Sequence, residues 1–94
     1  MENARILRFL RCGAKPVIDL AIEMAGLTYK ESLAAQYVGV LGMSQEQAAE
    51  YIEAHHLVES CSVDTMHLWH KAAMRKLSRA WDGVWWVGIM ADYN

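Results

Sequence analysis

Imidazole and thiol side chains gather in one stretch of this chain. Residues 55–70 hold His55, His56, Cys61, His67 and His70. Imidazole nitrogen together with thiolate sulfur is a ligand set that Zn²⁺ prefers in proteins. However, the spacing matches no common structural zinc pattern, and His67 and His70 are one helical turn apart. We therefore expect neither a metal nor a cofactor.

A cysteine with a nearby histidine could also act as a nucleophile and its base. Cys61 with His55 or His67 would supply these two groups. No glycine-rich turn that could form an oxyanion hole accompanies them, and no positioned carboxylate does either. The residues predict a protein that is not an enzyme.

The basic residues suggest binding rather than catalysis. All nine Lys and Arg fall within residues 5–30 and 71–79, and the segment 31–70 contains none. That middle segment carries acidic residues instead: Glu31, Glu46, Glu50, Glu53, Glu59 and Asp64. Such a layout can present a basic face to one partner while the acidic part points elsewhere, although the formal net charge is only -2. Charge alone favours solvated helix faces over a binding surface.

Length and composition limit the class of protein. The 94 residues suffice for one domain (1–94), and 54% of them are hydrophobic, which is enough for a core. No apolar segment is as long as a membrane span, and no cleavable hydrophobic stretch follows Arg5, Arg8 and Arg11. Two cysteines are too few for a disulfide framework. We expect a cytoplasmic protein that does not bind membranes.

Hydrophobic periodicity and helix-end signals predict an all-α fold, a small bundle of about five helices. Gly13 and Gly26 end the first two helices, and Pro16 suits the first turn of the second. The last helix is the longest and begins with either Ser62 or Asp64 as its cap. The expected ranges are about 2–11, 16–25, 28–42, 44–56 and 62–81.

Two capping boxes mark the third and fourth helices. In each, a hydroxyl and a side chain three residues later bond to each other's backbone N–H, here Thr28 with Glu31 and Ser44 with Gln47. Between these helices, Gly42 can adopt the left-handed conformation that stops a helix, and Met43 can fill the corner. This short turn followed by another helix predicts a helix-turn-helix. Gly39 would weaken its helix unless close packing needs a glycine.

The C-terminal tail, residues 82–94, is rich in aromatic and apolar residues and could form a short helix or a strand-like extension. Together with Trp81, it presents Trp85 and Trp86, too much apolar surface to leave in water. We favour a tail that completes the core. A partner or homodimer interface is the alternative, because Trp is enriched at binding hot spots.

Two stretches in the expected order resemble a known family. LTYKESLAAQYVGVLGMSQEQAAEYI (27–52) is similar to the first half of region 4 of sigma-70 family transcription factors, with an L-T-x-x-E start, a Y-V helix, G-apolar-S and an A-E helix. SVDTMHLWHKAAMRKLSRAW (62–81) resembles the recognition helix of that region. The residues on family positions there are Thr65, Met66, Ala73, Met74, Lys76 and Leu77.

The chain departs from the family pattern in several places. The insertion EAHHLVES separates the two halves further than is usual, and Leu68 and Trp69 replace positions that are commonly polar or basic. A full sigma factor also needs a region that binds core polymerase and melts promoters, for which 94 residues leave no room. The resemblance therefore implies a small sigma-like transcription regulator of phage or mobile-element type, with residues 27–81 as the region 4-like part.

This resemblance implies binding of double-stranded DNA by the last long helix in the major groove. Base or sugar contacts would come from Ser62, Asp64, Thr65, His67 and Lys71. Phosphate contacts would come from Lys30, Arg75, Lys76 and Arg79. The alternative is a protein-binding adaptor or inhibitor that keeps a sigma-like fold to engage RNA polymerase or another protein. It is favoured by the low net charge, Leu68, Trp69 and the tail.

Overall fold

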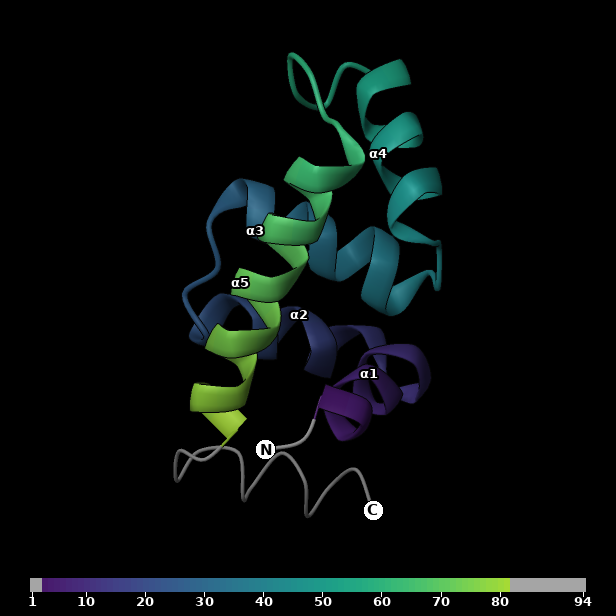
Figure 1. Ribbon diagram of the computed structural model, residues 1–94. Coiled ribbons are helices and arrows are strands. Elements are labelled where there is room, and N and C mark those ends of the chain that lie inside the picture. The colour runs from purple at the N-terminus through teal and green to yellow at the C-terminus, as the bar shows by residue number, and fades with distance from the viewer. Residues whose placement is uncertain (1–2, 82–94) are drawn as a thin grey trace.

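Helices make up all the regular secondary structure that the computed structural model describes, which covers residues 3–81, with Trp81 described by its backbone alone. Figure 1 shows how these helices pack. They are α1 (Asn3–Cys12), α2 (Lys15–Met24), α3 (Tyr29–Ala34), the π-helix η1 (Ala35–Val40), α4 (Gln45–Ala54) and α5 (Val63–Trp81). The predicted all-α bundle of about five helices is confirmed for this part of the chain.

The predicted capping boxes are present at the starts of α3 and α4. Thr28 Oγ1 accepts the Glu31 N–H at 3.2 Å, and the Thr28 N–H donates to Glu31 Oε1 at 2.9 Å. Ser44 and Gln47 make the same reciprocal pair, with both distances 3.1 Å. Both capping boxes therefore satisfy backbone N–H groups that have no partner inside their helices.

The third helix differs from the predicted continuous helix over 28–42. After Ala34 the chain widens into η1, and the Leu41 N–H donates to Gln36 O at 2.9 Å, a bond across five residues. Gly39 lies in this wider segment and packs against α1, where an added Cβ would lie 2.6 Å from Leu10 Cδ1. Close packing is thus the reason for a glycine at this position.

The turn after η1 has the geometry expected from its residues. Gly42 has φ +71°, the left-handed conformation, and the Met43 N–H donates to Tyr37 O at 3.0 Å. A residue with a Cβ would be strained at that φ. The turn therefore stops η1 and leads directly to Ser44, the cap of α4.

Residues 55–62 form a loop, so α4 is shorter than the predicted 44–56. It ends at Ala54, and His56 has φ +54°, a conformation that turns the chain away from the helix. The Cys61 N–H donates to Glu53 Oε2 at 3.1 Å, which holds the end of the loop against α4. The EAHHLVES insertion is therefore the last two residues of α4 followed by loop.

Two clusters of buried side chains make up the core, and α5 takes part in both. The C-terminal half of α5 supplies Ala73, Met74 and Leu77 to a cluster with α1 and α2. Its N-terminal half supplies Met66 to a cluster with α3, η1 and α4. Figure 1 shows α5 running from beside α4 at one end to α1 and α2 at the other. This places one face of α5 in the core along most of its length and leaves the opposite face in solvent.

Candidate nucleic-acid interface

The solvent face of α5 carries a ladder of basic residues that begins at His67, whose Nδ1 lies 3.2 Å from Gln45 Oε1 of α4. His67, Lys71, Arg75 and Arg79 recur every four residues and are all exposed. Positions four apart differ by about 40° around a helix axis and by about 6 Å along it, so the ladder extends over about 18 Å. Among the described residues, Lys71, Arg75 and Arg79 form no ion pair. Within residues 3–81, no carboxylate therefore neutralises these charges.

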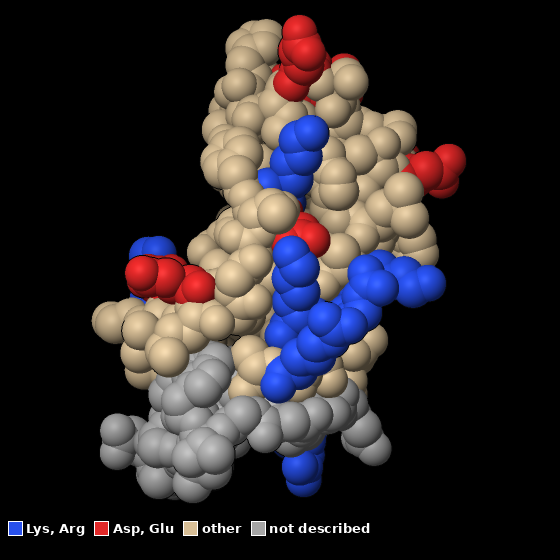
Figure 2. Space-filling model, turned by 90° about the vertical axis from the view of Figure 1, so that its left-hand side faces the viewer, with Lys and Arg blue, Asp and Glu red and all other residues tan. Residues whose placement is uncertain are grey.

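Figure 2 shows the side of the molecule that is on the left in Figure 1. Lys and Arg side chains gather in its middle and lower part, and most of the Asp and Glu side chains in view lie near its edges. One acidic patch lies among the basic side chains in this view, so the separation of charge that the sequence predicted along the chain is only partial in space.

The predicted contact residues at the start of α5 have a structural role. Ser62 Oγ accepts the Thr65 N–H at 3.1 Å and lies 2.9 Å from Thr65 Oγ1, so Ser62 is the cap of α5. Asp64 is exposed in the first turn, where a carboxylate stabilises a helix through its dipole. Ser62 and Asp64 were alternative caps in the sequence, and the hydrogen bond assigns the cap to Ser62.

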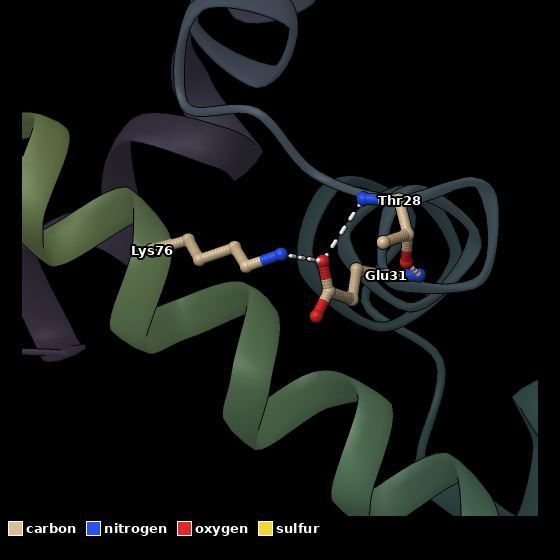
Figure 3. A network of polar contacts seen from close by, with 3 residues as sticks. All are labelled: Thr28, Glu31 and Lys76. Atoms are coloured by element: carbon tan, nitrogen blue, oxygen red, sulfur yellow. Dashed lines mark hydrogen bonds and ion pairs between the residues drawn. The ribbon is translucent and has the colours of Figure 1, made fainter.

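Lys76 points to a different place from the ladder. Its Nζ donates to Glu31 Oε1 at 2.7 Å, and the same oxygen accepts the Thr28 N–H (Figure 3). The Lys76 side chain is 35% exposed and that of Glu31 is 12% exposed. Partial burial would raise the pKa of Glu31, but the hydrogen bonds from Lys76 and Thr28 and the charge of Lys76 outweigh it and leave that pKa below its ordinary value. Lys76 thus joins α5 to α3 and is not a free cation.

Lys30 of α3 lies beside α5, with its Nζ 5.6 Å from the centroid of the Trp69 ring. This is a cation–π distance, and Lys30 remains exposed. Leu68, which is 64% exposed, lies on the ladder side of α5 between His67 and Lys71 in the helix sequence. The surface around the ladder is therefore basic, with an exposed apolar side chain near its N-terminal end.

The outer face of α4 has the opposite charge. Glu46, Glu50 and Glu53 from α4 and Glu59 from the loop line an open hollow of about 600 Å³. Cys61, Ser62 and Val63 line the same hollow, so the first turn of α5 lies beside these carboxylates. The two ends of α5 thus have different electrostatic surroundings.

The histidine and cysteine residues do not assemble into a metal site within residues 3–81, where no group of three His, Cys, Asp or Glu side chains could hold an ion. Burial, and next the charge of Glu53, raises the pKa of the Cys61 thiol, which keeps it protonated at neutral pH. His70 lies on the inner side of α5, and its Nε2 is buried without a hydrogen-bond partner. Burial, and next the charge of His67, lowers the pKa of His70.

A second basic surface, which was not among the predicted sites, lies on α1. Arg8 and Arg11 are exposed on its outer side, and Lys15 follows at the start of α2. The signal was present in the spacing of Arg5, Arg8 and Arg11, which places them on one helix face.

The predicted partner residues Trp85 and Trp86 and the side chain of Trp81 lie outside the described residues. None of the helices described over residues 3–81 is both long and apolar enough to cross a membrane. Comparisons of the chain with protein-family models, curated proteins and solved structures find no match. The similarity to sigma region 4 therefore stays a prediction from the residues.

Proposed function

We propose that this protein is a DNA-binding transcription regulator of helix-turn-helix type that holds duplex DNA against the outer face of α5. The observation that carries the proposal is the exposed ladder of His67, Lys71, Arg75 and Arg79, whose cations have no carboxylate partner among the described residues. Phosphate oxygens are the anions that such a row of Lys and Arg binds best.

The charge of α4 determines which part of α5 meets the duplex. In a helix-turn-helix, the N-terminal residues of the recognition helix contact base edges. Here Ser62 and Val63 share a hollow with four glutamates, which repel phosphate. The proposal therefore assigns DNA contact mainly to residues 67–79, with Lys30 at the margin, and leaves Ser62, Asp64 and Thr65 as the helix start.

The test is fluorescence anisotropy of a labelled random-sequence duplex at several salt concentrations. Three phosphate contacts give a slope of log K against log salt of about -2.7, so that binding weakens about 40-fold between 50 and 200 mM salt. In Lys71→Ala/Arg75→Ala, one remaining contact reduces the slope to about -0.9. Arg8→Ala/Arg11→Ala removes the same charge from α1 and is the matched control. An equal loss in both variants, or no binding at low salt by the folded protein, would refute the α5 interface.

The second candidate is the protein-binding adaptor, and exposed Leu68, between His67 and Lys71 at the N-terminal end of the ladder, favours it. Leu68→Lys separates the two functions, because an added cation strengthens a phosphate contact but places a charge in an apolar protein interface. Binding of the duplex and of purified bacterial RNA polymerase would be measured for wild type and variant. Tighter DNA binding supports the first function, and polymerase binding that Leu68→Lys abolishes supports the second.

A further inference from the structure

A hollow of about 400 Å³ lies between α1, α2 and η1, away from the ladder residues. Its volume falls in the range of roughly 300–1,000 Å³ that is typical of small-molecule sites. Residues from α1, α2, α3 and η1 line it, and those at its open side include Arg11, Lys15, Asp19, Val40 and Leu41. None of them belongs to the proposed DNA interface.

The floor of the hollow is apolar and its rim is charged. Leu10, Ile18 and Leu33 are buried beneath the hollow. The apolar surface that a ligand can reach comes from Val40, which is partly buried, and from Leu41, which is 61% exposed. Apolar surface that is open to water in this way is stabilised by an apolar ligand. Gln36 and Tyr37 add polar groups that are partly buried.

The charges at the rim favour an anion. Lys15 Nζ lies 3.3 Å from Asp19 Oδ2, so these two exposed charges largely offset each other. Arg11 forms no ion pair or hydrogen bond within residues 3–81 and supplies the remaining positive charge. A guanidinium can hold a carboxylate or sulfonate through two parallel hydrogen bonds.

We propose that this hollow binds a small amphipathic anion, with its apolar body against Val40 and Leu41 and its carboxylate or sulfonate at Arg11. The ligand contacts α1, α2 and η1 at once. Because it binds the folded chain, it stabilises the protein against unfolding in proportion to the logarithm of its concentration above Kd. This site is independent of DNA binding.

The experiment uses decanoate as the probe and decan-1-ol as its neutral counterpart. Both are titrated into the full-length ¹⁵N-labelled protein, and amide shifts report where each binds. We expect saturable shifts at residues 10–18 and 33–41 with decanoate, and binding of decanol that is about fivefold weaker, as expected for one exposed ionic contact. Shifts confined to other residues would overturn the proposal.

Variants at the rim test the role of each group without disturbing the buried floor. Arg11→Ala should bind decanoate about fivefold more weakly and decanol unchanged, while Arg8→Ala, one turn away on α1, should bind both as wild type does. Leu41→Asp should weaken decanoate by more than tenfold, because it removes apolar contact and adds a negative charge. If decanoate and decanol bind equally and Arg11→Ala changes neither, the anion preference is refuted.

Discussion

Helices α4 and α5 follow each other in the chain, and the start of α5 lies beside the hollow on α4, yet the outer faces of the two helices carry opposite charges. On α4 the exposed turns hold Glu46, Glu50 and Glu53, and on α5 they hold Lys71, Arg75 and Arg79. In a protein that inserts both helices of a helix-turn-helix against DNA, both faces meet phosphate. The difference indicates that a duplex approaching this molecule would be attracted by the C-terminal part of α5 and repelled near its start.

Reversing the charge of the α5 face should have the largest effect. Lys71→Glu/Arg75→Glu replaces two attractive phosphate contacts by two repulsive ones, and we expect DNA affinity at 50 mM salt to fall by about 100-fold. Anisotropy measures the affinity, and circular dichroism checks that the helix content is unchanged. Unaltered affinity of the folded variant would show that the two faces do not differ toward DNA.

Lys76, which pairs with Glu31, should contribute more to stability than the exposed Lys71. Lys76→Met leaves the Glu31 carboxylate partly buried without its ion pair, and we expect the free energy of unfolding to fall by about 1 kcal/mol. Lys71→Met, on the exposed face, should change it by less than about 0.5 kcal/mol. Urea denaturation measures both.

For DNA affinity, the variant with the larger effect should be Lys71→Met, the one that changes stability less. Lys71→Met should weaken binding, and Lys76→Met should leave it as in wild type. A loss of affinity in Lys76→Met that equals that in Lys71→Met would place Lys76 in the interface after all.

Neutralising the α4 face should have a smaller effect, of opposite sign. In Glu46→Gln/Glu50→Gln we expect DNA to bind about threefold more tightly at 50 mM salt, because repulsion at the start of α5 is removed. The gain should disappear as salt shortens the screening length. Asp19→Asn/Glu23→Gln makes the same change of charge on α2, and an equal gain there would mean that only net charge matters.

The smallest effect concerns the inner face of α5 and is seen through pH. The folded-state pKa of His70 is lowered from its ordinary value of 6.5, so the unfolded chain takes up a proton first as pH falls. Stability should be complete above pH 6.5, decrease as pH drops from 6.5 to the folded-state pKa, and level off below it. Glu31, whose pKa is lowered from 4.5, contributes its own loss only below that value. In thermal melts from pH 7.5 to 3, His70→Leu should remove the first decrease, and the second decrease, below pH 4.5, should remain.

The helix ends could be predicted because their causes are local. Each capping box joins two residues that are three positions apart, Thr28 with Glu31 and Ser44 with Gln47. The left-handed conformation of Gly42 depends only on the absence of a side chain at that position. The π-helical segment could not be predicted, because its setting depends on the contact of Gly39 with Leu10, twenty-nine positions earlier.

The candidate interface was predictable in part for the same reason. Spacing of four residues places Lys71, Arg75 and Arg79 on one face of any helix. Lys76 carries the same charge as these residues and lies on the same helix, but its role depends on the position of Glu31 in α3. The hollow beside Arg11 is formed by four helical segments that pack together, and no spacing in the sequence indicates it.

The participation of α5 in both buried clusters has a consequence for synthesis on the ribosome. Met66 completes one cluster and Ala73, Met74 and Leu77 complete the other, so neither is whole until this late segment has left the exit tunnel. A nascent chain that ends before Val63 holds two apolar surfaces without their common partner. We therefore expect the helices to gain lasting order together, after translation has passed α5, and not one cluster after the other.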